Sequence, residues 1–152
     1  MSVAGKPYIL DDAATSGLIT EPDSSWTVPW LLADRIARTP DSTLIEHKAA
    51  LGHSWVKVTA HSFGEDVARV ASGLMGMGLE PGQCVSIMAH TSYEWTLLDM
   101  AIARAGLVSV PIYETDSASQ VRWILQDADV RLVITESAAL AELVRGAAAA
   151  RA

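Results

Sequence analysis

The fold is decided by the stretch from Gly82 to Leu125, in which strand-like and helix-like segments alternate. Its successive parts are Cys84-Val85-Ser86-Ile87-Met88-Ala89, Thr91-Ser92-Tyr93-Glu94-Trp95-Thr96-Leu97-Leu98-Asp99, Leu107-Val108-Ser109-Val110-Pro111-Ile112-Tyr113-Glu114-Thr115 and Ser117-Ala118-Ser119-Gln120-Val121-Arg122-Trp123-Ile124-Leu125. The first part is nearly all apolar, which is typical of a strand buried in a parallel sheet. The hydroxyl residues that open the second and fourth parts are typical of helix starts. The stretch therefore predicts a strand–helix–strand–helix unit.

The same alternation continues towards the C-terminus. The predicted elements are a strand at 84–89, a helix from 91 to Ala105 closed by Gly106, a strand at 107–110 halted by Pro111, a helix opened by a capping box at 117–120, a strand at 130–135 and a helix from Ser137. The helix after Ser117 places Val121, Ile124, Leu125 and Ala128 on its buried face. Strands that alternate with helices imply right-handed crossovers and a parallel sheet.

Upstream of Gly82 the pattern changes. The first predicted elements there are a helix at 30–38 that ends before Pro40 and a β-hairpin of strands at 43–46 and 54–59 with Gly52 in its turn. A second helix is predicted to begin with a capping box at Ser62–Glu65 and to end at Gly78 and Pro81. The last helix carries apolar residues at helical spacing, namely Phe63, Val67, Val70, Leu74 and Met77. Residues 1–25 show no sustained period and are expected to form an irregular arm. Residues 26–152 are expected to form an incomplete α/β unit, because no strand follows the last helix to extend the sheet.

Composition narrows the classes of function. Half of the 152 residues are hydrophobic and 19% are charged, which indicates a folded chain. A formal net charge of −7 would repel phosphate backbones, so no nucleic acid partner is expected. Cys84 lies in an apolar run and is expected to be a buried core residue. Neither a signal peptide nor a run of about 20 apolar residues is seen, so we expect a cytoplasmic protein without a transmembrane segment. Peripheral membrane contact stays open.

Two places resemble anion-binding loops. Gly73, Gly76 and Gly78 are close together, but they fall at the end of a helix, whereas a phosphate loop follows a strand and opens a helix. The junction His90-Thr91-Ser92 does follow a strand and open a helix, at the end of the sheet where α/β proteins bind ligands. Helix capping explains its hydroxyl groups without a ligand, and the two interpretations stay open at this point.

The remaining reactive side chains show no catalytic spacing. The histidines at 47, 53, 61 and 90 lack the spacing of metal ligands, and no serine-nucleophile elbow is present. Helix-dipole and capping roles explain most of the acidic residues considered, which are Glu94, Asp99, Glu114, Asp116, Asp127 and Asp129. Of the five tryptophans, Trp95 and Trp123 are predicted on core-facing helices, while Trp26 and Trp30 are candidates to anchor the arm or a partner. No residue is assigned a catalytic, cofactor-binding or metal-binding role.

Several segments resemble the opening of long-chain fatty acid–CoA ligases of the adenylate-forming, AMP-binding family, in particular their actinobacterial type. The most specific is 82–125; the others are Trp30-Leu31-Leu32-Ala33-Asp34-Arg35 with Thr39-Pro40, Trp55-Val56-Lys57-Val58-Thr59 leading into Phe63, Gly73-Leu74 with Gly78, and Leu132-Val133-Ile134-Thr135. The resemblance covers roughly residues 26–136. It implies part of the first subdomain of the large N-terminal domain of such an enzyme.

The resemblance also implies an activity for the full-length family. These enzymes join a fatty acid to AMP with release of pyrophosphate, and coenzyme A then displaces AMP; ATP, Mg²⁺ and coenzyme A are the cofactors implied. The family's Ser/Thr/Gly-rich loop ending in Pro-Lys-Gly, its Tyr-Gly-x-Thr-Glu segment, its ribose-binding aspartate and its C-terminal lysine have no counterpart here. The chain is therefore expected to be a fragment or truncated form, inactive alone.

Two other hypotheses stay open. The chain is alternatively a non-catalytic binding or dimerisation module, which pairs through an exposed sheet edge or the N-terminal arm. A third reading is a small nucleotide-binding protein that uses the junction at 89–92.

Overall fold

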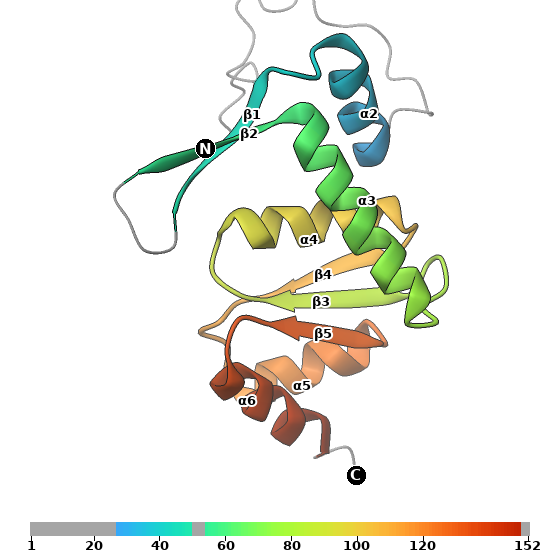
Figure 1. Ribbon diagram of the computed structural model, residues 1–152. Helices are drawn as coiled ribbons and strands as arrows, with labels where there is room; N and C mark the ends of the chain where they lie inside the picture. The colour runs from blue at the N-terminus through green and yellow to red at the C-terminus, as the bar shows by residue number, and fades with distance from the viewer. Residues whose placement is uncertain (1–26, 50–53, 150–152) are drawn as a thin grey trace, which may run out of the picture.

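The computed structural model describes residues 27–49 and 54–149. In chain order the elements are α2 (Val28–Arg38), β1 (Thr43–Lys48), β2 (Trp55–Thr59), α3 (Ala60–Gly76), β3 (Cys84–Met88), α4 (Tyr93–Arg104), β4 (Val108–Ile112), α5 (Ala118–Asp127), β5 (Leu132–Thr135) and α6 (Ala138–Ala149) (Figure 1). The predicted order of helices and strands is confirmed. The arm at 1–25, the turn at Gly52 and Trp26 lie outside the described residues.

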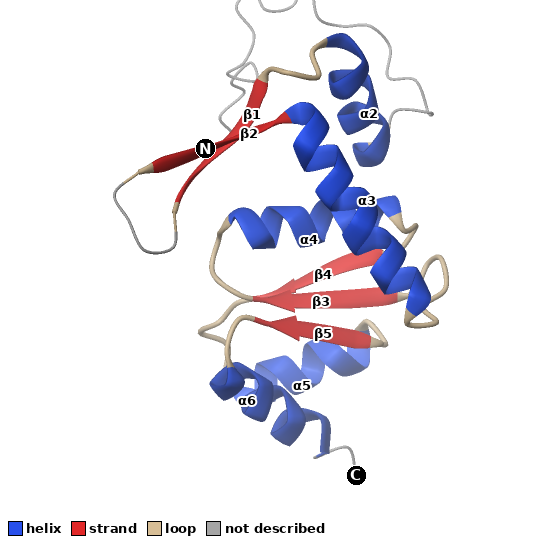
Figure 2. Cartoon of the chain, viewed as in Figure 1, coloured by secondary structure: helices blue, strands red, loops and turns tan. Residues whose placement is uncertain are grey.

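The central layer is a parallel sheet of three strands in the order β4-β3-β5. Helices α3 and α4 cover one face of this sheet, and α5 and α6 cover the other (Figures 1 and 2). The predicted α/β class with a parallel sheet is thus confirmed. Because β3 leads into α4 and β5 leads into α6, the chain leaves these neighbouring strands towards opposite faces. Such a switch point is the usual place for a ligand in an open α/β sheet.

Strand β3 separates two hydrophobic cores. Its residues Val85 to Met88 have no exposed surface, as the apolar run predicted. Val85 and Ile87 belong to a core formed with α3 and α4, whereas Met88 belongs to a second core with Val121 of α5 and Ala147 of α6. Alternate residues of a strand point to opposite faces, so this one strand anchors both helical layers.

The β-hairpin contacts the helices beside the parallel sheet through Tyr93 at the start of α4. Strands β1 and β2 pair antiparallel, which confirms the predicted hairpin. The ring of Tyr93 stacks on His47 of β1 with centroids 4.7 Å apart and meets Phe63 edge-on. The Tyr93 hydroxyl donates to Asp66 of α3 over 2.7 Å. One aromatic side chain therefore ties the hairpin to both α3 and α4.

The predicted start of α3 is wrong. The helix begins at Ala60, and Thr59 caps it, because the Thr59 hydroxyl accepts a hydrogen bond from the Ser62 amide over 3.2 Å. Thr59 has the extended backbone of the last residue of β2, so the chain passes from strand to helix without a loop. Ser62 thus lies inside the helix, and Glu65 lies 3.5 Å from the His61 ring instead of closing a capping box.

Three burial predictions also need correction. Trp123 is 64% exposed because the buried face of α5 carries Val121, Ile124 and Leu125, and Trp123 lies two residues from Val121 on the opposite side. Met77 follows the end of α3 and is exposed, and Cys84 is only half-buried at the first position of β3. Trp95 does pack against the first core, as predicted.

The predicted stop at Pro111 is wrong as well. Strand β4 continues through Pro111 to Ile112. It lies at the edge of the sheet, where a missing backbone N–H is tolerated. None of the helices in 27–49 and 54–149 has the length and apolar character needed to cross a membrane.

Candidate functional site

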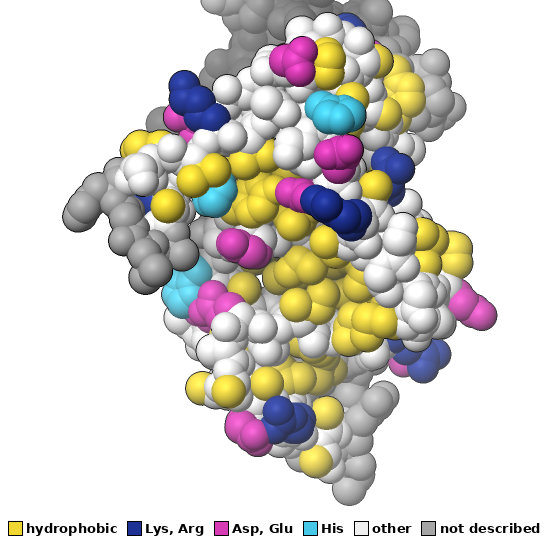
Figure 3. Space-filling model, in the orientation of Figure 1, with side chains coloured by type: hydrophobic (Ala, Val, Ile, Leu, Met, Phe, Trp, Pro, Cys, Tyr) yellow, Lys and Arg dark blue, Asp and Glu magenta, His cyan; other side chains and the backbone are white. Residues whose placement is uncertain are grey.

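The candidate site lies at the carboxyl edge of the sheet, where the loops after β3, β4 and β5 meet. Each loop contributes one titratable side chain: His90 follows β3, Glu114 follows β4 and Glu136 follows β5. The carboxyl ends of parallel strands share one edge, so residues far apart in sequence come together there. Figure 3 shows histidine and acidic side chains side by side at the edge towards which the strand arrows of Figure 1 point.

His90 is held by both carboxylates. Its backbone amide donates to Oε2 of Glu136 over 2.8 Å, and its ring Nδ1 lies 2.5 Å from Oε1 of the same carboxylate. Its other ring nitrogen, Nε2, lies 3.3 Å from Oε1 of Glu114. One imidazole therefore connects the loops after all three strands of the sheet.

The electrostatics of the cluster follow from this geometry. The hydrogen bond that the His90 ring donates to Glu136, followed by the charges of Glu114 and Glu136, raises the pKa of His90 above its ordinary value. The backbone and ring hydrogen bonds from His90 lower the pKa of Glu136. The two pKa shifts are opposite in sign, and both favour the charged forms, a protonated His90 beside an ionised Glu136.

Two pockets flank the His90 loop. One, of about 470 Å³, lies on the β5 side and is lined by Ala89, Ser92, Trp95, Ile134 and Glu136 among others. The other, of about 430 Å³, lies on the β4 side and is lined by His90, Trp95, Ile112, Tyr113 and Glu114 among others. Trp95 of α4 lines both pockets. Each pocket combines apolar side chains with at least one glutamate.

At the junction predicted as a possible anion site, a carboxylate of the protein binds His90. Ser92 is the cap of α4, since its hydroxyl accepts from the Trp95 amide over 3.1 Å. The His90 amide, one of the N–H groups at this junction, is bonded to Glu136. Of the two interpretations, capping is confirmed for Ser92, and Glu136 takes the role that an anionic ligand would have.

The cluster does not converge on a point where a metal ion would sit. The two carboxylates bind different ring nitrogens of His90, whereas ligands of one ion must face a common centre. In the part of the chain that the structure describes, no group of three or more His, Cys, Asp or Glu side chains is placed to hold a metal.

The other sequence candidates lie elsewhere. Gly73 and Gly76 are inside α3, and Gly78, with a φ of +81°, follows its end, so these glycines end a helix as predicted. His47 stacks on Tyr93 and His61 lies on α3 beside Glu65; His53 lies outside the described residues. Glu94 is in the first turn of α4, as a helix-dipole role requires.

Sequence reasoning missed the roles of Glu114 and Glu136. Glu114 pairs with His90, which differs from the helix-dipole and capping roles expected for most of the acidic residues, and Glu136 pairs with the other ring nitrogen of His90. The sequence does carry a signal for this role, because each glutamate lies within two residues of the end of a parallel strand. That position brings both residues to the edge that also carries His90.

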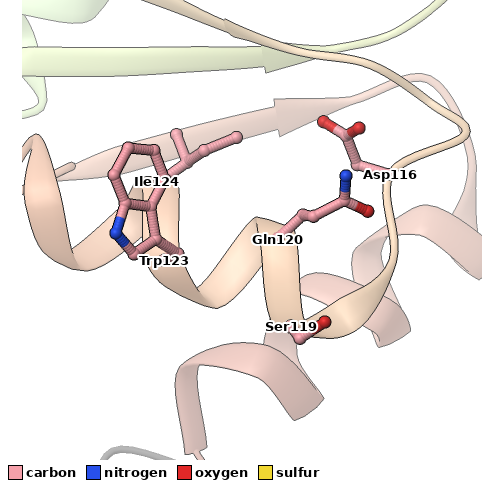
Figure 4. Close-up of a pocket in the computed structure, with 5 residues that line it drawn as sticks. All are labelled: Asp116, Ser119, Gln120, Trp123 and Ile124. Atoms are coloured by element: carbon pink, nitrogen blue, oxygen red, sulfur yellow. The ribbon is translucent and has the colours of Figure 1, made fainter.

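A further pocket, of about 350 Å³, lies on α5 and is drawn in Figure 4. Trp123 and Ile124 form its apolar end, and Asp116 lies at its other end with Gln120 between them. Its polar groups already have local partners: Asp116 accepts from the Tyr113 amide, and Gln120 accepts from Ser117 in the predicted capping box. The pocket thus follows from the turn and cap that begin α5.

Comparison with known proteins identifies the family. Residues 32–152 match the family model described as AMP-binding enzyme. The long-chain-fatty-acid–CoA ligase FadD15 of Mycobacterium bovis is 38% identical over 104 residues, which cover 68% of this chain and 17% of that protein. The chain thus spans about a sixth of the length of this curated relative.

Two solved structures extend the likeness to the fold. The complex of VinN with L-aspartate matches at 26% identity with a TM-score of 0.71, over 80% of this chain and 33% of that one. The N-terminal subdomain of NpsA from Klebsiella oxytoca matches at 22% identity with a TM-score of 0.65, over 73% and 28% of the two chains, and shows the fold alone. The predicted resemblance is confirmed: the chain belongs to the AMP-binding enzyme family.

Proposed function

We propose that the chain is part of an ATP-dependent long-chain fatty acid–CoA ligase, which forms acyl-CoA, AMP and pyrophosphate from a fatty acid, ATP and coenzyme A. The observation that carries this proposal is the 38% identity to a ligase of that name. The α/β unit supplies scaffold in this proposal: strands and helices that support the nucleotide and acyl sites of the whole enzyme. The expected compartment is the cytoplasm, with ATP, Mg²⁺ and coenzyme A as the cofactors of the whole enzyme.

The 152-residue chain is proposed to be inactive by itself. Adenylation needs a loop that stabilises the negative charge developing on the transferred phosphate groups. The clustered glycines lie at a helix C-terminus, and the junction at His90 has its amide bonded to Glu136. Carboxylates at this edge disfavour the anionic substrates of the reaction. No described residue is therefore assigned a catalytic role.

Two measurements test the proposal. The purified chain is expected to give no ATP–pyrophosphate exchange with palmitate, and exchange by pure material would overturn the inactivity. A chimera, in which the matching 104-residue segment of FadD15 is replaced by that of this chain, is expected to form palmitoyl-CoA within about tenfold of the parent rate. A chimera that folds and binds ATP but makes no palmitoyl-CoA would overturn the assignment to this class of ligase.

The second candidate function is a dimerisation module, favoured by the edges of the sheet. In the described residues β4 and β5 each pair on one side only, and Val108 of β4 is exposed. Unpaired edges are templates for pairing with another chain. Light scattering after size exclusion tests this: a dimer that Val108→Lys dissociates supports the module, and a monomer at every concentration excludes it.

A further inference from the structure

We propose that His90 is a pH-sensitive clasp, which holds the loops after β3, β4 and β5 together when its ring is protonated and releases the loop after β4 when the ring becomes neutral. This proposal concerns the fold of the chain itself and does not depend on the ligase assignment. Its basis is the placement of the imidazole between Glu136 on one ring nitrogen and Glu114 on the other.

The two contacts of the ring respond differently to deprotonation. A protonated imidazole donates from both nitrogens, so each carboxylate has a charged donor. A neutral ring keeps one proton, and the closer contact, from Nδ1 to Glu136 at 2.5 Å, favours retaining it there. Nε2 then has a lone pair that faces Oε1 of Glu114 at 3.3 Å, where two acceptors repel each other. The link to β5 therefore survives deprotonation, and the link to β4 does not.

The surrounding charges favour the closed form at lower pH. Glu136 and Glu114 are the charged groups that shift the pKa of His90. Glu94 of α4 lines the adjoining pocket on the β5 side, and Lys48 of β1, with His47, lines the pocket beyond Thr91. Because the pKa of His90 is raised, its link is fully present below the ordinary histidine value and is lost as the pH rises through the raised value. The lowered pKa of Glu136 keeps its charge throughout that range.

Release would change one pocket rather than both. The pocket on the β4 side is lined by His90 and Glu114, the two residues that separate. The pocket on the β5 side is lined by Glu136, which keeps its bonds to His90. The clasp thus predicts that the loop at 113–116 gains freedom with pH while the loop after β5 stays in place.

The test is an NMR titration of the ¹⁵N-labelled 152-residue chain from about pH 5 to about pH 9, which includes the range in which histidine changes charge. Neutral His90 is expected to carry its proton on Nδ1, and the amides of 113–116 are expected to titrate with its ring. Glu114→Gln should lower the pKa of His90 and uncouple these amides from it. Glu136→Gln should lower the pKa of His90 as well.

Glu65→Gln is the matched control, because Glu65 lies 3.5 Å from the exposed ring of His61 and far from the clasp in sequence. This variant should leave the titration of His90 unchanged. The proposal is overturned if neutral His90 carries its proton on Nε2, if the amides of 113–116 do not follow its titration, or if its pKa is the same in all variants. Amide dispersion in each spectrum shows that the variant is folded; if Glu136→Gln unfolds, Glu114→Gln decides.

Discussion

Ser86 lies at the centre of β3 with no exposed surface, and its hydroxyl has no hydrogen-bond partner among the described residues. A buried hydroxyl without a partner costs about 1–3 kcal/mol. Ser86→Ala is therefore expected to raise the free energy of unfolding by about 1 kcal/mol, measured by urea denaturation. Ser92→Ala removes the same atom from the cap of α4 and should lower that free energy by about 0.5–2 kcal/mol. Loss of stability in Ser86→Ala would show that its hydroxyl does have a partner.

Tyr93 provides a second prediction for a single residue. Its hydroxyl donates to Asp66, and this hydrogen bond is the largest cause of the lowered pKa of Asp66. Burial, followed by Asp66, raises the pKa of Tyr93 to about 12. A lowered carboxyl pKa stabilises the fold above the ordinary aspartate value, and this stabilisation is lost as the pH falls through the lowered value. Tyr93→Phe should therefore shift acid unfolding to higher pH, as followed by circular dichroism.

The matched control for that prediction is Tyr113→Phe, because Tyr113 is 75% exposed. At neutral pH Tyr93→Phe is expected to cost about 1 kcal/mol, and Tyr113→Phe close to nothing. Equal acid midpoints in the wild type and Tyr93→Phe would mean that Asp66 does not depend on the Tyr93 hydroxyl in solution.

Glycines at two helices should respond oppositely to the same substitution. Gly106 ends α4 with a φ of +74°, and a Cβ there would lie 3.4 Å from Cβ of Pro81. Gly73 lies inside α3, with nothing within 4 Å of an added Cβ. Gly106→Ala is expected to destabilise the protein by about 1–2 kcal/mol, since L-residues strain in the left-handed region. Gly73→Ala should stabilise it by about 0.5–1 kcal/mol. Thermal melting of both variants checks the pair, and a shift of the same sign in both would contradict it.

Individual elements show what the sequence can predict. The capping box at Ser117 forms as expected, with both of its hydrogen bonds present, because all of its partners are local. The box at Ser62 does not form, because Thr59 already caps the helix at the end of a strand whose length local patterns do not determine. Pro111 is tolerated in β4 only because that strand lies at an edge, which is a property of the sheet order. The His90 cluster likewise depends on which loops the sheet order brings together.

At the scale of the whole molecule, the sheet divides the interior into two unequal cores. Among the residues that the structure describes, twelve buried residues form the core with α3 and α4, whereas four form the core with α5 and α6. Hydrophobic burial is the main stabilising term in folding, so the smaller core should hold its helices less firmly. In Figure 1 the sheet lies between α3 with α4 and α5 with α6, which allows α5, β5 and α6 to open before the rest.

Two neighbouring residues of β3 belong to different cores. Ile87 belongs to the larger core and Met88 to the smaller, and both are fully buried. Either change to alanine should cost about 2–5 kcal/mol locally. We expect Met88→Ala to speed hydrogen exchange in α5 and α6 while α3 and α4 stay protected, whereas Ile87→Ala should lower protection throughout, because loss of the larger core unfolds the whole chain. Hydrogen exchange followed by mass spectrometry checks both variants. Equal loss of protection in all helices of Met88→Ala would show instead that β3 couples both layers into one cooperative unit.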